Sequence, residues 1–248
     1  MQHYFLKQSA QLGASVDLNS DISRHWVKVM RATPGDHAEF VDLNGNLFLG
    51  QLQTSTDEKT TVKLVENLDS KSEIPVNVTL IMGLPKQDKA DWIVQKTTEM
   101  GVSEVIFFAA DWSVAQWKGN RIDKKLERLQ KIAAGASEQS HRLKIPTIKY
   151  EKSLENIITS FSGRLLVAYE EAAKQGEKSE LCHQLGEVKS GDNLAVVVGP
   201  EGGISPAEIQ LLENYNGIKV GLGPRILRTE TAPLYFLAAV STIIELNS

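Results

Sequence analysis

Apolar and polar residues alternate along much of the first 70 residues, which is the pattern of short β-strands that bury one face. The alternation is loose over residues 36–42, strict over 47–53, and present again over 60–66. Between the first two runs, Asn44-Gly45 is a dipeptide favoured in tight hairpin turns. We therefore predict a small β-barrel or meander in this region, preceded by a short helix over residues 25–31.

After a polar segment that ends at Pro75, the pattern changes to short apolar runs that alternate with amphipathic stretches. Apolar runs of this kind are typical of strands in a buried parallel sheet. We predict strands over residues 76–82, 105–109, 165–169 and 194–198, and helices over 89–100, 122–140, from 205 onward, and over 231–246. The predicted fold class is α/β, with a β-rich domain over residues 1–70 and an α/β domain over residues 71–248.

Two glycine-rich segments follow β-branched runs near the end of the chain, and each precedes a predicted helix. They are Gly199-Pro200-Glu201-Gly202-Gly203 and Gly221-Leu222-Gly223-Pro224-Arg225-Ile226-Leu227-Arg228-Thr229-Glu230-Thr231-Ala232. Turns at the carboxyl ends of strands are where open α/β sheets bind ligands, and glycine lets a ligand approach the backbone closely. These segments therefore predict a small-molecule site that is lined largely by main chain.

Neither segment matches the common nucleotide-binding motifs. A P-loop requires a lysine after its last glycine, and no lysine follows Gly203. The dinucleotide fingerprint fails because Ile226 stands where its third glycine belongs.

The two segments resemble the signature loops of the RsmE family, which are bacterial ribosomal RNA uridine N3-methyltransferases of the SPOUT superfamily. The resemblance extends upstream over nearly the whole chain, to residues 25–31, 83–86, 95–102 and 138–142. Two positions depart from the family, which usually has Gly where His141 stands and often Leu where Met30 stands.

This resemblance implies a fold, a cofactor and a substrate. The fold is a PUA-like RNA-binding β-barrel followed by a SPOUT domain with a trefoil knot, whose cofactor site lies within about residues 165–248. The cofactor is S-adenosylmethionine, and the substrate is a uridine of 16S rRNA in the small ribosomal subunit, by family uridine 1498. The implied cofactor-binding residues are Leu166, Gly199, Pro200, Glu201, Gly202, Gly203, Leu222, Gly223, Ile226, Leu227, Thr231 and Ala232. Leu166, Ile226 and Leu227 are expected to form the apolar walls of the adenine slot.

Methylation of uridine N3 requires that its proton be removed, and a cation and a base in the second loop would promote that step. Arg228 is the candidate to stabilise negative charge on the uracil ring, and Glu230 is the candidate base if burial raises its pKa. The alternative is that these two side chains pair with each other, or that Glu230 interacts with the N-terminus of the last helix. The candidates for RNA contact are His25, Arg31, Lys86, Lys89 and Arg142.

Composition limits the remaining possibilities. The single cysteine, Cys182, excludes an internal disulfide and a cysteine-based metal cluster, and we expect a cytoplasmic protein with no metal and no membrane span. The net charge of −4 argues weakly against nucleic acid, but residues 118–152 contain ten Lys and Arg against four Asp and Glu. This stretch is either a basic RNA-binding region or a solvated helix face with paired charges.

The last predicted helix is apolar on nearly every side, so we expect it to be covered both by its own domain and by a partner in a homodimer. Burial of this helix within one subunit is the alternative. Two other functions stay open beside the favoured one: a catalytically silent RNA-binding or assembly module, and a ribose 2′-O-methyltransferase. The complete second loop argues against a silent module, because such a protein does not need a cofactor pocket.

Overall fold

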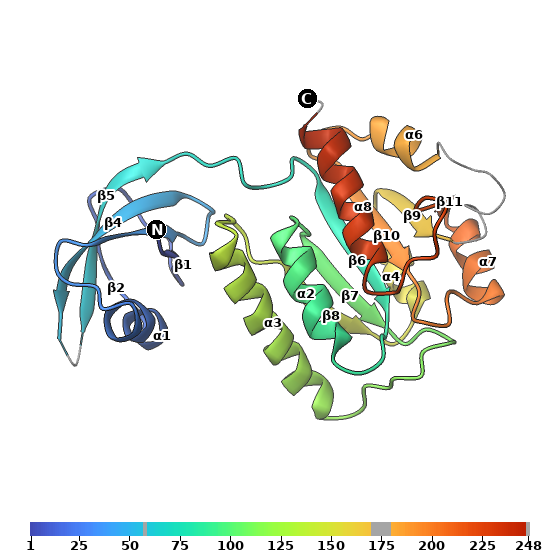
Figure 1. Ribbon diagram of the computed structural model, residues 1–248, viewed down its shortest axis with the longest axis horizontal. Helices are drawn as coiled ribbons and strands as arrows, with labels where there is room; N and C mark the ends of the chain where they lie inside the picture. Colours follow the sequence, from blue (N-terminus) through green and yellow to red (C-terminus); the bar gives the residue numbers. More distant parts are fainter. Residues whose placement is uncertain (57–58, 170–179, 247–248) are drawn as a thin grey trace. The chain divides into compact units, whose positions relative to one another are not determined.

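The structure is a computed structural model that describes residues 1–56, 59–169 and 180–246 (Figure 1). It divides into two compact units. The first contains Met1–Glu73 together with Ser137–Lys144, and the second contains Ile74–Ala136 and Ile145–Ser248. The sequence predicted a first domain that ends at residue 70, and it did not predict that residues 137–144 belong with it.

The first unit is built on a five-stranded mixed sheet in the order β1-β3-β4-β5-β2. Strands β1 and β3 run parallel, and the other neighbours are antiparallel. The predicted strands and the predicted turn between β3 and β4 are present, whereas alternation over only three residues was too short to reveal β1 and β2. The bounds are β1 His3–Phe5, β2 Ser15–Asp17, β3 His37–Val41, β4 Leu47–Ser55 and β5 Thr60–Leu68, with helix α1 Ser20–Ser23 continuing into a π-helical turn, Arg24–Val29.

Aromatic side chains form the core of this unit. Trp26 packs edge-on against Phe40 with ring centroids 5.6 Å apart, and Tyr4 lies beside both. Gly50 in β4 is required here, because a Cβ atom at this position would lie 2.5 Å from the Phe40 ring.

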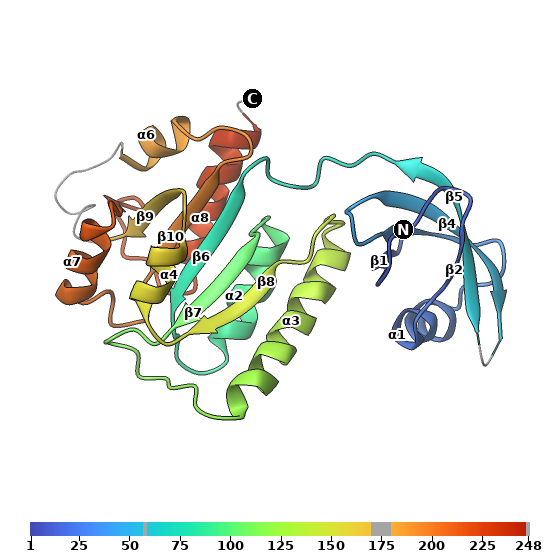
Figure 2. The same ribbon diagram turned by 180° about the vertical axis from the view of Figure 1, so that it is seen from behind.

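The second unit contains a six-stranded, wholly parallel sheet in the order β11-β9-β10-β6-β7-β8. Its strands are apolar on both faces because helices cover both faces (Figure 2). Strand β8 and helices α4 and α6 were not predicted, and β11 was indicated only as the β-branched run before the second glycine-rich segment. The strands are β6 Asn77–Gly83, β7 Glu104–Phe108, β8 Thr147–Glu151, β9 Arg164–Ala168, β10 Asn193–Val198 and β11 Ile218–Val220.

Helices α2, α3, α6 and α8 pack on one face of this sheet, and α4 and α7 pack on the other. The predicted capping box at the start of α7 is present: the Ser205 hydroxyl accepts from the Glu208 N–H, and the Glu208 carboxylate accepts from the Ser205 N–H. Within the described residues, none of the helices combines the length and the apolar composition that crossing a bilayer requires. The bounds are α2 Lys89–Glu99, α3 Arg121–Gln139, α4 Leu154–Ser160, α6 Glu180–Gly186, α7 Pro206–Asn214 and α8 Ala232–Val240, the last continuing as a π-helical turn, Ser241–Glu245.

Candidate cofactor site and its neighbours

The two glycine-rich segments lie together at the carboxyl edge of the parallel sheet. The first leaves the end of β10 and the second leaves the end of β11, with β9 hydrogen-bonded between these two strands. Thr229 joins the two loops, because its buried hydroxyl donates to the Gly199 carbonyl over 2.7 Å. The sequence did not single out Thr229, because one threonine within a loop carries no signal of its own.

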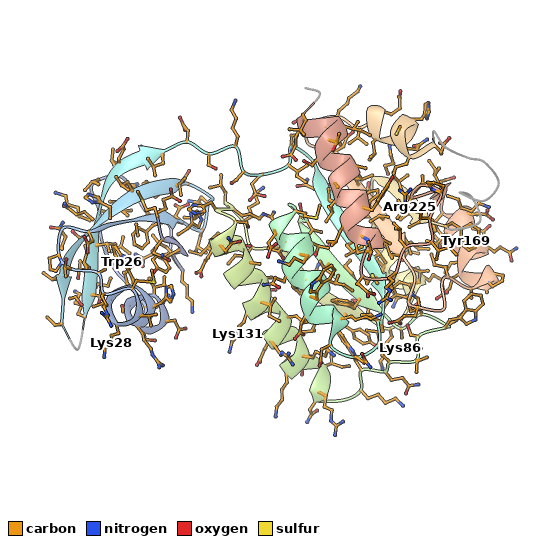
Figure 3. All side chains as sticks on the ribbon, in the orientation of Figure 1. Trp26, Lys28, Lys86, Lys131, Tyr169 and Arg225 are labelled. Carbon is orange, nitrogen blue, oxygen red and sulfur yellow. The ribbon has the colours of Figure 1, made fainter. Side chains whose placement is uncertain are left out.

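The loops enclose a pocket of about 680 Å³, a size that holds a nucleoside-sized ligand. Most of the predicted cofactor residues line it, together with several that sequence reasoning missed. The predicted ones are Gly199, Pro200, Glu201, Gly202, Gly203, Leu222, Gly223, Ile226, Leu227 and Ala232, and the missed ones include Trp112, Ala168, Tyr169, Ile204, Pro206 and Thr229. In Figure 3, Tyr169 and Arg225 are labelled at this end of the second unit.

Two predicted cofactor residues do not line the pocket. Leu166 is fully buried in β9 and packs in the core between the sheet and its helices. Ala168, two residues further along the same strand, reaches the pocket instead. Thr231 lies exposed immediately before α8, where its carbonyl accepts the N–H of Tyr235.

Trp112 packs against the first glycine loop. A Cβ atom at Gly202 would lie 2.9 Å from the Trp112 Cβ, so the absence of a side chain at Gly202 makes room for the tryptophan. The preceding residue, Asp111, is fixed to the start of α7: its N–H donates to Glu208 over 3.0 Å, and its carboxylate accepts from the Ser205 hydroxyl over 2.5 Å. These bonds hold Trp112, which is 47% exposed, at the wall of the pocket.

Lys89 is held between two carboxylates at the edge of the pocket. Its Nζ lies 2.9 Å from both Glu201 Oε1 and Glu230 Oε2, and Glu201 also accepts the backbone N–H of Lys86. The hydrogen bonds to Glu201 and Glu230 raise the pKa of Lys89. The positive charge of Lys89 is therefore already balanced by carboxylates. Of the two candidate lysines, Lys86 is the exposed one that can contact a phosphate.

The pKa of Glu230 does not meet the condition set for a general base. Burial by itself raises this pKa, but the hydrogen bond from Lys89 and the nearby charges of Lys89 and Arg228 lower it overall. A carboxylate with a lowered pKa is a weaker base, so Glu230 is better described as a partner of Lys89. Arg228 is exposed and lines the pocket.

The predicted RNA-contact residues divide into exposed and buried ones. Arg31 and His25 are exposed, and the His25 ring is held by Tyr4, whose hydroxyl lies 2.9 Å from His25 Nδ1. Arg142 is only 2% exposed and its guanidinium pairs with the Glu73 carboxylate over 2.7 Å. A guanidinium that is buried and paired in this way is not available to a phosphate, so the structure contradicts the predicted role of Arg142. The surrounding basic stretch is also partly neutralised, since Arg128 pairs with Asp91 and Lys149 with Glu104.

Comparison with known proteins agrees with this geometry. Residues 72–241 match the model of an RNA methyltransferase domain. The chain is 38% identical to ribosomal RNA small subunit methyltransferase E of Bacillus subtilis, over 99% of this chain and 98% of that protein. The chain belongs to the ribosomal RNA small subunit methyltransferase E family.

Solved structures show the same fold over full length. The family enzyme of Neisseria gonorrhoeae, determined with bound S-adenosyl methionine, is 28% identical and superposes with a TM-score of 0.84 over 98% of this chain and 97% of that one. A crystal structure described as that of a hypothetical protein is 34% identical, with a TM-score of 0.87 and complete coverage of both chains. The family membership that the two glycine loops indicated is therefore confirmed.

Proposed function

We propose that this protein transfers a methyl group from S-adenosylmethionine to N3 of a uridine in 16S rRNA of the small ribosomal subunit, by family uridine 1498. The observation that carries the proposal is the pocket between the two glycine loops at the carboxyl edge of the sheet. Membership of the family and the cofactor bound in the Neisseria gonorrhoeae structure support it. We also expect the trefoil knot of the SPOUT fold and a PUA-like role in RNA binding for the first unit.

The residues of the pocket fit this cofactor. Gly199 and Gly203 pack closely, because a Cβ atom at Gly199 would lie 2.6 Å from the Gly203 carbonyl carbon; these two glycines and Gly223, which has φ +79°, line the pocket. Leu222, Leu227 and Ala168 supply apolar walls, as an adenine ring requires. When bound, S-adenosylmethionine supplies an activated methyl group on a sulfonium that is a good leaving group.

The protein's own contribution is alignment and charge. Loss of the N3 proton places negative charge on the uracil ring and its oxygens, and the guanidinium of Arg228 is positioned at the pocket to stabilise that charge. Glu201 in the first loop forms an ion pair with Lys89 and accepts the Lys86 N–H, and Glu230 in the second loop also pairs with Lys89. These bonds fix the first loop to the start of α2. We propose that His25, Arg31 and Lys86 contact RNA, since all three are exposed.

The direct test is to incubate the protein and S-adenosylmethionine with small ribosomal subunits from a strain that lacks the gene. Mass spectrometry of the digested rRNA should show N3-methyluridine. Appearance of 2′-O-methyluridine instead would support the ribose methyltransferase, and no methylation of active subunits would support a silent RNA-binding module.

Replacement of Thr229 by alanine should weaken binding of S-adenosylmethionine about tenfold. The change removes the hydroxyl that joins the loops and leaves the buried Gly199 carbonyl without its donor, a loss of roughly 1–2 kcal/mol. Isothermal titration calorimetry measures the affinity, and Thr229→Ser, which keeps the hydroxyl, is the matched control. Equal affinity of the alanine variant and the wild-type protein would contradict the proposed role of this bond.

We further propose that the protein is a homodimer through the surface that contains α8. The outer side of this helix is apolar, with Tyr235 37% exposed and Leu246, just beyond it, 76% exposed. Light scattering at micromolar concentration should give twice the 27.4 kDa mass of the chain. A mass of one chain would show that α8 is covered within one subunit only.

A further inference from the structure

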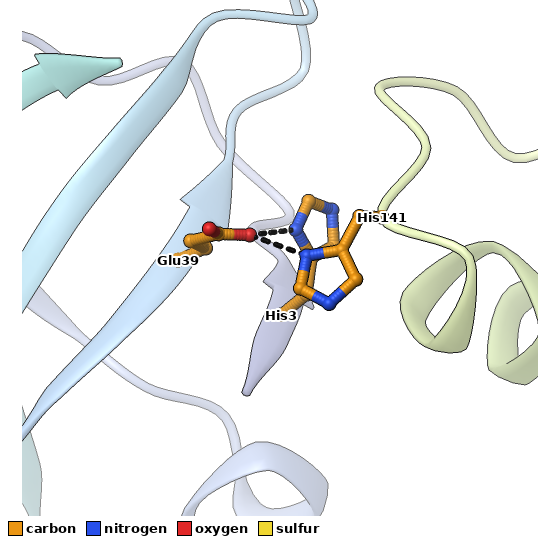
Figure 4. A group of neighbouring side chains, drawn as sticks. All are labelled: His3, Glu39 and His141. Carbon is orange, nitrogen blue, oxygen red and sulfur yellow. Dashed lines mark hydrogen bonds and ion pairs between the residues drawn. The ribbon is translucent and has the colours of Figure 1, made fainter. Parts of the chain in front are cut away.

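Three side chains that are far apart in the sequence meet within the first unit: His3, Glu39 and His141. Parallel pairing of β1 with β3 places His3 opposite Glu39, and the turn after α3 brings His141 to the same carboxylate (Figure 4). The ligand-type atoms of the three lie within 4.8 Å of one another. Within the described part of the chain, this is the one set of three or more His, Cys, Asp or Glu side chains close enough to share an ion.

Hydrogen bonding determines which nitrogen of His3 carries a proton. Its Nε2 lies 2.8 Å from the carbonyl oxygen of Arg142, and because a carbonyl only accepts, Nε2 is the protonated nitrogen. The Nδ1 atom of neutral His3 therefore carries a lone pair, and it faces Glu39 Oε2 at 2.8 Å. Two electron-pair donors at this distance repel each other unless a positive charge lies between them.

His141 adds a third donor atom to the same point. Its Nδ1 lies 2.7 Å from the same Glu39 oxygen. The His3 side chain is fully buried, that of Glu39 is 19% exposed and that of His141 is 46% exposed, so the group is closed on one side and open to solvent on the other. This arrangement leaves one position for a water molecule as a fourth ligand.

We propose that His3 Nδ1, Glu39 Oε2 and His141 Nδ1 form a binding site for a divalent transition metal of the zinc class. Two imidazoles and one carboxylate favour such ions over Mg²⁺ or Ca²⁺, which prefer oxygen ligands. A backbone carbonyl bound to the other nitrogen of His3 is the partner that metal-binding histidines usually have, and it orients the ring. Tetrahedral bonds of about 2.0 Å require these N···O separations to open to roughly 3.3 Å, a small movement for the partly exposed Glu39 and His141.

The ion would have a structural role. It would hold Ser137–Lys144 against β1 and β3 within the first unit, and it lies outside the pocket between the glycine loops. Spacing in the sequence gives no sign of this site, because the ligands that meet at Glu39 are separated from it by 36 and 102 residues. The expectation of no metal rested on the single cysteine and on the absence of a cluster of metal ligands in the sequence.

The test uses the full-length protein, freed of metal with a chelator and titrated with Co²⁺ and with Zn²⁺ at neutral pH. We expect one equivalent of Co²⁺ to give visible d–d absorption, competition by Zn²⁺, and a melting temperature that rises by several degrees with Zn²⁺. His141→Gly should lower the affinity at least tenfold. This variant is expected to fold, because His141 has φ +54°, a conformation that glycine adopts freely.

Two matched controls define the site. His37→Ala removes an exposed histidine at the start of β3, and Cys182→Ser removes the exposed thiol; both should bind Co²⁺ as the wild-type protein does. The proposal is overturned if the wild-type protein shows no Co²⁺ absorption, or if His141→Gly binds as tightly as the wild type. In either case hydrogen bonds alone would hold the three side chains together.

Discussion

Replacing Arg228 by alanine should lower the rate of methyl transfer by about 10²–10³-fold, with little change in the affinity for S-adenosylmethionine or RNA. The guanidinium is exposed at the pocket, and the charge that it is proposed to stabilise develops only during the reaction. A group that interacts mainly with the transition state affects turnover more than binding. Single-turnover methylation of small ribosomal subunits measures the rate. Calorimetry measures the affinity for S-adenosylmethionine, and filter binding measures the affinity for RNA.

Arg225→Ala is the matched control, because Arg225 lines the same pocket, is also exposed and lies on the same loop. Its removal should change the rate much less. If Arg228→Ala instead methylates at the wild-type rate at saturating RNA and loses RNA affinity with a flatter salt dependence, Arg228 is a phosphate contact.

Replacing Arg142 by alanine should destabilise the first unit by about 3–5 kcal/mol. The guanidinium is almost completely buried, and Nε and Nη2 donate to the two oxygens of Glu73 over 3.2 and 2.7 Å. Glu73 also accepts the backbone N–H groups of Leu143 and Lys144, so the variant leaves a carboxylate held in place without its main counter-charge. Chemical denaturation, followed by circular dichroism, measures the loss.

Arg128→Ala is the control for this experiment, because Arg128 forms an ion pair with Asp91 but its side chain is 62% exposed. Exposed pairs contribute little, so this variant should change stability by less than about 1 kcal/mol. A stable Arg142→Ala variant that binds RNA more weakly would restore the phosphate-contact interpretation that the burial of Arg142 contradicts.

Hydrophobic patterning predicted the longer elements because their burial is periodic. Strand β4 and helix α3 lie within a few residues of their predicted bounds, since each repeats its pattern over many residues. Strands β1, β2 and β11 are three residues long and contain too few positions for a period to appear. Leu166 shows a different limit: periodicity identifies the face of a strand but not how far along it the pocket begins.

Contacts between residues that are remote in the sequence explain the other differences between the predicted and the observed site. The positive charge of Arg142 suggested a contact with RNA. In the structure its buried guanidinium pairs with Glu73, which is 69 residues away in the sequence. The pKa of Glu230 is likewise lowered by Lys89, a residue that is remote from it in the sequence. Trp112 and Thr229 belong to no motif, and only the folded loops reveal that one packs on Gly202 and the other bonds to Gly199.

The division of the first unit into two stretches has a consequence for synthesis on the ribosome. Ser137 follows Glu73 by 64 residues, so at roughly 5–20 residues per second the second stretch is made about 3–13 s after the first. Throughout that interval His3 and Glu73 lack the partners that Ser137–Lys144 supplies. The nascent chain therefore carries all five strands of the N-terminal sheet without the segment Ser137–Lys144, while much of the second unit is still to be made. We expect this interval to be the period when the chain is most sensitive to proteases and most dependent on chaperones.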